Sequence, residues 1–304
     1  MWTELIQQSR GALHVFLPLL DRGLDAVVHR LTDGEYIPLQ VKCKREAPNG
    51  FVEIGIPAAE LVDDRALIIA GLLTDDGLGR MLLVVDEATF KARASRSPVH
   101  GEDIYTASFS ADSLKSHWRP YLVRREQLAK RLLGSAPPLP LLESVDETAG
   151  KPIDRYSRWL GFLGEAEVIR RLAENTGLDL FRPFPDVELV EVLVRNSADG
   201  RFLGLQVKAA VPNDTYGAAR IAIRKATFMP AASTFVVALA WLPDRGRFAD
   251  ECLVVPTERL TKIALDGGTH WMLNFHPHSQ ERTRLDPYRR PLSALSEFIQ
   301  DSLL

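Results

Sequence analysis

Two groups of polar residues, one in each half of the chain, combine a carboxylate, a carboxamide and an ammonium group. They are Asp25, Gln40 and Lys42 in the first half, and Glu191, Gln206 and Lys208 in the second. Burying such groups without partners is costly, so water or a bound ion must reach them where they gather on one face. The alternative interpretation is an exposed cross-strand ion pair, which contributes little stability and requires no function.

A β-hairpin is predicted to bring the first group together. Asp33-Gly34 lies between two strand-like runs, and Asp-Gly in that setting is typical of a two-residue hairpin loop. Such a loop places Asp25 opposite Lys42 and Val27 opposite Gln40. Directly opposed residues share a face of the sheet, so we expect the carboxylate, carboxamide and ammonium to project together.

The second hairpin, around Asp199-Gly200, is predicted to repeat this geometry. Glu191 then faces Lys208, with Gln206 on the same side. In the first hairpin the alternate residues, such as Leu39 and Val41, should point into a core.

The hairpins belong to a repeat that runs along the whole chain. An offset of 166 residues separates Asp25 from Glu191 and Lys42 from Lys208. Further landmarks follow in the same order, in which residues 66–73 parallel 235–242, residues 83–85 parallel 253–255, and Pro120-Tyr121 parallels Pro287-Tyr288. Preserved order and spacing predict a tandem duplication of one domain.

The repeat predicts two domains of the α/β (α+β) class, each with a central mixed sheet flanked by helices. We expect domains over residues 1–133 and 157–304, joined by a proline-rich linker over 134–156.

Local patterns predict the elements of the second copy. A helix is expected over residues 164–177, strands over 219–223, 234–241 and 252–255, and a helical stretch over 225–232. The opening helix of the first copy is expected to be about one turn shorter, because 12 residues separate Glu4 from Phe16 where 16 separate Glu165 from Phe181.

Composition indicates an ordinary globular protein, with 46% hydrophobic and 25% charged residues. The net charge is -3, so any contact with nucleic acid must be local. Cys43 and Cys252 are the 2 cysteines, which supports neither a disulfide framework nor a zinc motif. No apolar run approaches the roughly 20 residues of a membrane span, and the first residues lack a signal-peptide pattern, so we expect a cytoplasmic protein without membrane contact.

The order of these motifs resembles the PD-(D/E)XK phosphodiesterase superfamily, which has the restriction-endonuclease-like fold. The resemblance rests on a helix with Gly164-Glu165, an acidic residue on the first hairpin strand, and Gln-Val-Lys on the second. The Gln-x-Lys form is similar to the variant near the archaeal Holliday-junction resolvases. The motif spans residues 161–210 in the second copy and 11–45 in the first.

The resemblance implies site residues. The metal-binding aspartate of the family falls on Asp25 and Glu191, the (D/E)-x-K element on Gln40 and Lys42 and on Gln206 and Lys208, and the helix acid on Glu165. Gln replaces the usual carboxylate in both copies, which keeps an oxygen ligand but removes a negative charge. Glu4 is the counterpart of Glu165 in the first copy, and Asp186 and Glu188 are alternative ligands in the second.

The implied activity is phosphodiester hydrolysis with Mg²⁺ or Mn²⁺ held by the carboxylates and amide oxygens. Lys208 or Lys42 would orient the attacking water or stabilise developing charge. DNA is the expected substrate, with RNA as an alternative, and two joined copies would suit a duplex as a pseudo-symmetric dimer. Predicted phosphate contacts are Lys42, Lys44, Arg45, Arg220, Arg224 and Lys225, although such residues are also common on solvated surfaces.

Two functions from different classes follow. The first is a metal-dependent nuclease that acts on DNA, in defence or repair. The second is a non-catalytic nucleic-acid-binding or scaffold protein built from two degenerate nuclease folds.

Overall fold

The computed structural model divides the chain into two compact units, Met1–Glu143 (unit 1) and Ser144–Leu304 (unit 2). The described residues are 1–9, 12–19, 23–75, 77–99, 101–114, 116–134, 155–184, 190–213, 217–277 and 282–303. Most of the predicted linker, residues 135–154, lies outside them, and a helix begins at Arg155.

Unit 1 contains three α-helices and nine strands among its described residues. They are α1 (Trp2–Ser9), β1 (Leu13–Pro18), β2 (Ala26–Arg30), β3 (Glu35–Lys44), β4 (Phe51–Pro57), β5 (Leu67–Thr74), β6 (Gly77–Asp86), α2 (Glu87–Arg93), β7 (Ser95–Val99), β8 (Glu102–Ser110), β9 (Leu122–Arg124) and α3 (Leu128–Leu133). The main sheet has the order β1-β2-β3-β5-β6-β9, and a small sheet has the order β4-β8-β7. The β3–β5 pair is parallel and its neighbours are antiparallel, so the main sheet is mixed.

Unit 2 repeats this order of elements in its described residues. They are α4 (Arg155–Ala173), β10 (Leu178–Phe184), β11 (Val192–Asn196), β12 (Phe202–Ala210), β13 (Ala219–Arg224), β14 (Thr234–Leu242), β15 (Arg247–Phe248), β16 (Glu251–Pro256), α5 (Thr257–Ile263), β17 (Leu265–Asp266), β18 (His270–Phe275), β19 (Arg289–Pro291) and α6 (Leu295–Ser302). The main sheet has the order β10-β11-β12-β14-β16-β19, with β15 paired to β14, and the small sheet has the order β13-β18-β17. The parallel pair is β12–β14, which corresponds to β3–β5.

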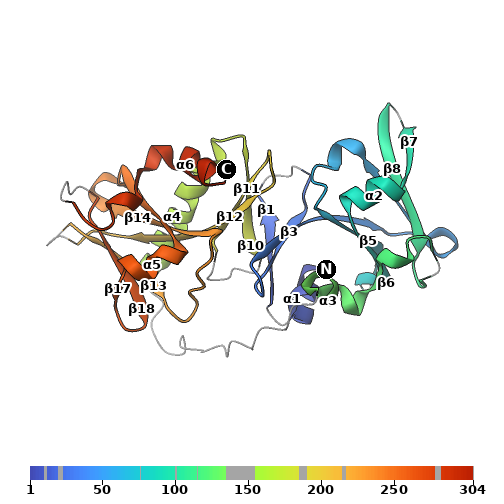
Figure 1. Cartoon of the computed structure of the whole chain (residues 1–304), viewed down its shortest axis with the longest axis horizontal. Helices are drawn as coiled ribbons and strands as arrows, with labels where there is room; N and C mark the ends of the chain where they lie inside the picture. Colours follow the sequence, from blue (N-terminus) through green and yellow to red (C-terminus); the bar gives the residue numbers. More distant parts are fainter. Residues whose placement is uncertain are drawn as a thin grey trace. The chain divides into compact units, whose positions relative to one another are not determined.

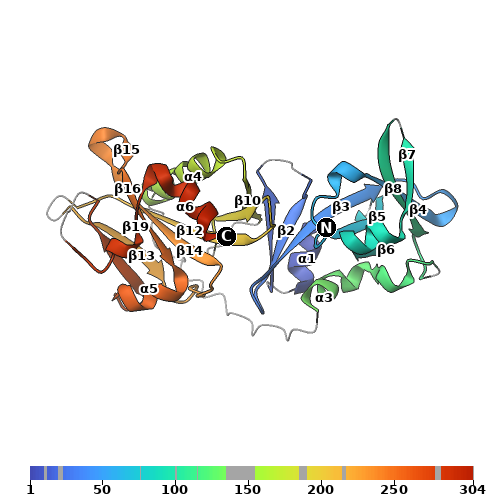
Figure 2. The same cartoon turned by 45° about the horizontal axis from the view of Figure 1, so that its top comes forward.

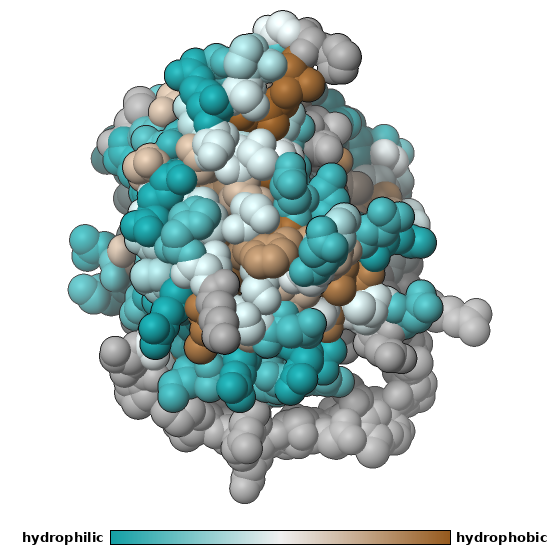
Figure 3. Space-filling model, turned by 90° about the vertical axis from the view of Figure 1, so that its right-hand side faces the viewer, coloured by the Kyte–Doolittle hydropathy of each residue, from teal (hydrophilic) through white to brown (hydrophobic). Residues whose placement is uncertain are grey.

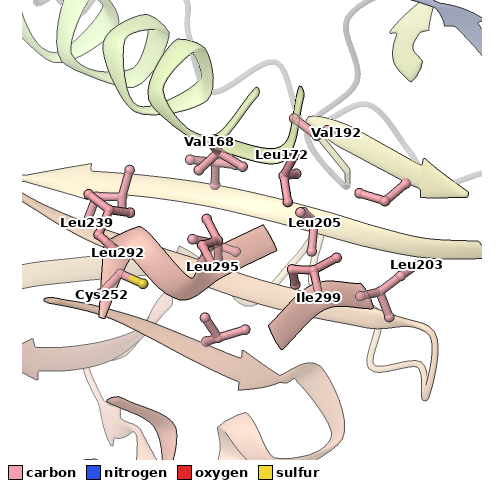
Figure 4. Close-up of a cluster of buried hydrophobic side chains, with 14 of the residues drawn as sticks. Val168, Leu172, Val192, Leu203, Leu205, Leu239, Cys252, Leu292, Leu295 and Ile299 are labelled. Carbon is pink, nitrogen blue, oxygen red and sulfur yellow. The ribbon is translucent and has the colours of Figure 1, made fainter. Parts of the chain in front are cut away.

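Each unit has layers on both faces of its main sheet (Figure 1). In unit 2, α4 and α6 cover one face, where Val168, Leu205 and Ile299 pack together (Figure 4). The small sheet and α5 cover the other face through Ile221, Val236 and Leu260. Burial of these apolar side chains from both faces stabilises the sheet and fixes its register.

Unit 1 has the corresponding layers, which are also visible in Figure 2. Its α1 and α3 pack on one face around Leu5 and Leu128, and α2 and the small sheet pack on the other around Phe90. Figure 3 shows unit 1 from the side that carries β7 and β8, where hydrophilic residues predominate and hydrophobic residues are scattered. Phe51 and Val99 are two of the exposed hydrophobic residues of this small sheet.

The structure confirms the predicted class, with mixed sheets flanked by helices, and corrects several elements. The predicted helical stretch over 225–232 is wrong, because these residues form turns and irregular chain that lead into β14. The predicted helix over 164–177 is α4, which starts nine residues earlier and ends at Ala173. The opening helix of unit 1 is shorter by far more than one turn, with 8 residues in α1 and 19 in α4.

The predicted hairpin register is also wrong, by two residues. Strand β2 pairs Ala26 with Leu39 and Arg30 with Glu35, and β11 pairs Val192 with Leu205. The predicted pairs Asp25–Lys42, Val27–Gln40 and Glu191–Lys208 are therefore not directly opposed. A shift of two keeps every side chain on its predicted face, and Leu39 lies in a core as expected.

The cause of the shift is a four-residue loop in place of the predicted two-residue loop. Gly34 N–H donates to the Arg30 carbonyl at 2.8 Å, and Gly200 N–H donates to the Asn196 carbonyl at 2.8 Å. Both glycines have a left-handed φ, of 76° and 69°, and this conformation favours glycine. Asp-Gly therefore supplies the last two residues of the loop, and Asp33 accepts the backbone N–H of Glu35.

Candidate active site

Glu191 stands where β11 separates from β12. Its backbone N–H still donates to the Leu205 carbonyl at 2.9 Å. Its side chain provides the next acceptor for β12 in place of a backbone carbonyl, because Oε2 accepts the Val207 N–H at 2.9 Å. The carboxylate therefore satisfies a buried backbone donor that the strand no longer reaches.

Asp25 has the same role in unit 1. Its N–H donates to the Leu39 carbonyl at 3.0 Å, and its Oδ2 accepts the Val41 N–H at 2.6 Å. The recurrence of an acidic residue at the start of the hairpin thus has a structural reason in both units. Asp25 differs from Glu191 in burial, since Asp25 is exposed and Glu191 is 8% exposed.

The two lysines have different partners. Lys208 Nζ binds Glu191 Oε1 at 2.7 Å. Lys42 Nζ binds Glu60 Oε2, also at 2.7 Å, and Glu60 lies in the short helix η2 (Ala58–Glu60). The predicted contact between carboxylate and lysine is therefore present in unit 2, whereas in unit 1 Glu60 replaces Asp25 as the partner.

Glu60 is a site residue that the sequence did not reveal. The β3–β5 and β12–β14 registers align Leu67 with Phe235, so Glu60 corresponds to Phe228. Phe228 packs against the apolar core below the small sheet of unit 2. Because the repeat is broken at this position, a comparison of the two copies could not identify Glu60.

Both glutamines are buried beside the lysines. Gln206 is 6% exposed and Gln40 is 1% exposed. Gln40 Nε2 donates to the Glu60 carbonyl at 3.2 Å, whereas Gln40 Oε1 is buried and accepts no hydrogen bond from the residues that the structure describes. A buried acceptor without a hydrogen bond lowers the stability of the folded protein unless a donor or a cation binds it.

Glu165 approaches the site from α4. A Cβ at the preceding Gly164 would lie 3.1 Å from the Ala209 Cβ and 3.5 Å from Val207 Cγ1, so glycine lets the helix lie close to β12. Glu165 Oε2 accepts from Arg182 Nη2 at 3.2 Å. In contrast, Glu4 pairs with Arg125 at 3.4 Å in unit 1.

The electrostatics of Glu191 combine opposing effects. Burial raises the pKa of Glu191, the Lys208 ammonium and the Val207 N–H oppose this, and the Glu165 carboxylate raises it further. Two carboxylates that repel each other in a buried setting form a site that gains from an additional positive charge.

A divalent cation fits this donor set by chemistry, because its side-chain oxygens belong to the carboxylates of Glu165 and Glu191 and to the amide of Gln206. Among the described residues, no group of three His, Cys, Asp or Glu side chains could hold a metal, so the set depends on the glutamine. Asp186 and Glu188, the alternative ligands, lie outside the described residues.

The predicted phosphate contacts occupy two regions. Lys44 ends β3 and Arg45 follows it, and both are exposed. Arg220 and Arg224 lie on the exposed face of β13, opposite Asn274 and His270 of β18.

Lys225 already has two contacts within unit 2. It binds Asp266 at 2.6 Å, and its Nζ lies 4.2 Å from the centre of the Trp271 ring. The corresponding face in unit 1 carries Phe51 and Glu53 opposite Ser110 and Ser108. The small sheet of unit 2 therefore presents basic residues where that of unit 1 presents none at the matching strand.

Among the described helices, none is long and apolar enough to cross a membrane. No protein-family model matches the chain, and no curated protein matches it. A bacterial homing endonuclease of known structure is similar to part of the chain, with a TM-score of 0.34 and 18% sequence identity. The match covers 48% of this chain and 93% of that chain. At this level of similarity, functional assignment rests on the residues of the chain itself.

Proposed function

We propose that the chain is a tandem-duplicated, divalent-metal-dependent nuclease that hydrolyses phosphodiester bonds in DNA, with its reaction centre in unit 2. The observation that carries the proposal is the ion pair between the buried Glu191 and the partly exposed Lys208, beside Gln206 and Glu165. Unit 2 is favoured over unit 1 because its lysine contacts the hairpin carboxylate and because α4 brings a second carboxylate close to it.

Each residue has a role that its environment supports. Glu165, Glu191 and Gln206 would hold Mg²⁺ or Mn²⁺, which supplies charge neutralisation at phosphate and lowers the pKa of bound water. Lys208 is 29% exposed, so its ammonium can reach a phosphate or a water at the surface while Glu191 orients it. Arg220 and Arg224, with Lys44 and Arg45 in unit 1, would contact backbone phosphates without reading sequence.

A specific observation favours a second candidate, a catalytically degenerate nucleic-acid-binding or scaffold protein. Both carboxylate oxygens of Glu191 already accept hydrogen bonds from the protein, from Lys208 and from the Val207 N–H. A cation would have to compete with the lysine for Oε1. The two candidates therefore differ in whether metal can displace this contact.

The test is cleavage of supercoiled, linear and branched DNA with Mg²⁺ or Mn²⁺ by the full chain. The variants are Lys208→Ala, Lys42→Ala and the double mutant, with Lys262→Ala, an exposed lysine on α5, as the matched control. We expect Lys208→Ala to lower the cleavage rate by at least about 100-fold, as loss of a group that stabilises transition-state charge does. Lys262→Ala should leave the rate unchanged.

Other outcomes would place the reaction in unit 1 or favour the second candidate function. Loss of cleavage only in Lys42→Ala would place the reaction in unit 1. Absence of metal-dependent cleavage by the unsubstituted protein, together with DNA binding that weakens steeply with salt, would establish the degenerate alternative.

A further inference from the structure

A second concave site lies in unit 2, apart from the residues assigned to hydrolysis. A cavity of about 480 Å³ is bordered by α4, the β14–β15 turn and the segment that leads into α6. Its volume falls in the range of small-molecule sites. None of Glu165, Glu191, Gln206 and Lys208 lines it.

The floor of the cavity is apolar and aromatic. Phe248 and Leu292 are 8% and 3% exposed, and Leu163 and Trp241 complete the surface. The Trp241 and Phe248 rings lie 5.0 Å apart between centroids and cross at 69°. Leu292 also joins the core around Leu295 and Cys252, so the floor rests on packed side chains (Figure 4). A rigid aromatic floor suits a planar ring.

Arginines on the wall supply positive charge, and Arg171 is the best placed to bind an anion. Its Nε donates to Glu167 at 2.8 Å, and its side chain is 26% exposed. Its two terminal nitrogens donate to no residue in the described part of the chain. By contrast, the Nε and both terminal nitrogens of Arg170 donate to Glu167 and Glu174.

The Nε–Glu167 hydrogen bond orients the Arg171 side chain. Its two terminal NH₂ groups, which can bind a phosphate in a bidentate manner, are not used in that contact. The cavity wall also holds Arg247, which pairs with Asp250. Among the described residues, the three arginines of the lining are balanced by three carboxylates, Glu167, Glu174 and Asp250. Arg171 contributes the two terminal nitrogens that donate to none of these carboxylates. A cavity lined by aromatic side chains and by the terminal nitrogens of Arg171 matches a ligand that combines a planar ring with a phosphate.

We propose that this cavity binds a nucleotide, with its base against Trp241 and Phe248 and its phosphate at Arg171. The nucleotide is either a free nucleoside monophosphate or the 5′-phosphorylated end of a strand. The proposal stands independently of phosphodiester hydrolysis.

The test is isothermal titration of the full chain with AMP and dAMP in EDTA, which prevents metal-dependent hydrolysis. We expect a dissociation constant on the order of 0.1 mM. Arg171→Met should weaken binding at least about 10-fold, since a charge-assisted hydrogen-bond pair is lost. Arg259→Met is the matched control, because Arg259 is an exposed arginine on α5 that does not line the cavity, and it should change the affinity less than about 3-fold. Adenosine should bind more weakly than AMP, and Lys208→Ala should bind AMP as the unsubstituted protein does.

A second arm distinguishes the two sources of the nucleotide. Short single strands with a 5′-phosphate or a 5′-hydroxyl are titrated under the same conditions. Tighter binding of the phosphorylated strand, lost in Arg171→Met, identifies a strand end, and binding of AMP alone identifies a free nucleotide. The proposal is overturned by the absence of AMP binding at concentrations of about 1 mM, or by equal weakening in Arg171→Met and Arg259→Met. If Arg171→Met does not fold, Trp241→Leu must weaken AMP binding instead.

Discussion

The two hairpins carry matching polar residues at matching positions, yet their lysines have different partners. Lys208 binds Glu191, whereas Lys42 binds Glu60. The acidic residues keep one shared task, since Glu191 and Asp25 each accept a backbone N–H from the neighbouring strand. The acidic residue of the repeated motif is therefore needed to accept a backbone N–H in both units. The partner of the lysine differs between the units, and in unit 1 it is a residue outside the motif.

Other matched positions differ in the same manner. His14 and His29 are paired across β1 and β2, and burial lowers the pKa of each to about 4. The matching position in unit 2 holds Asp179 and Arg195, which form an ion pair of 2.9 Å. Unit 1 therefore carries groups whose protonation changes on folding where unit 2 carries a paired charge.

The largest effect is expected from removing the two hairpin carboxylates in turn. Glu191→Ala should destabilise the strand pair by about 3 to 4 kcal/mol, because it leaves a buried amide without an acceptor and Lys208 without its partner. Asp25→Ala should cost about 1 kcal/mol, because Asp25 is exposed and loses one hydrogen bond. Hydrogen exchange at the amides of Val207 and Val41 measures both effects. Equal protection losses in the two variants would remove the distinction between the units.

A pH dependence of folding stability should distinguish unit 1 from unit 2. Burial raises the pKa of Glu87 to about 7, and its side chain is fully buried. The matching residue of unit 2 is Thr257, which accepts the Ala231 N–H as Glu87 accepts the Asp63 N–H. Because the folded pKa lies above the unfolded value, unit 1 is stabilised at low pH and loses stability as the pH rises from about 4.5 to 7.

Glu87→Gln should remove this dependence. The variant and the unsubstituted protein should be equally stable at about pH 5, and the variant should be more stable by about 2 to 3 kcal/mol at pH 8. Unit-resolved hydrogen exchange at the two pH values provides the measurement, with unit 2 as the internal control. A difference that is independent of pH would show that Glu87 has the same pKa in the folded and the unfolded protein, so that burial does not raise it.

The smallest effect is expected from removing the carboxylate that binds Lys42. Glu60→Gln removes the partner of Lys42 but keeps the backbone carbonyl that Gln40 binds. Glu60 is 42% exposed on its side chain, so the loss should be below about 1 kcal/mol. Reduced protection of the β3 amides by more than this would show that Glu60 has a larger structural role than an exposed ion pair. Urea unfolding followed by hydrogen exchange is the measurement.

Much of the architecture was predictable from residue patterns. The repeat, the strands around Val207 and Val237, and the shared face of Gln206 and Lys208 follow from hydrophobic alternation, which depends on local sequence. The helical stretch over 225–232 was wrongly predicted, because local propensity does not include tertiary contacts such as the Lys225–Asp266 ion pair and the packing of Phe228 against the core.

Strand periodicity is a local property, so the residue pattern was enough to predict the mixed α/β class and the face on which each polar side chain lies. The hairpin register, the partners of the lysines and the cavity at Arg171 depend on tertiary contacts. Register depended on a loop whose glycines adopt left-handed φ angles. Lys42 binds Glu60, and Arg171 and Trp241 line the same cavity, because packing of distant segments brings them together. Such contacts depend on the fold of each whole unit, which no local pattern encodes.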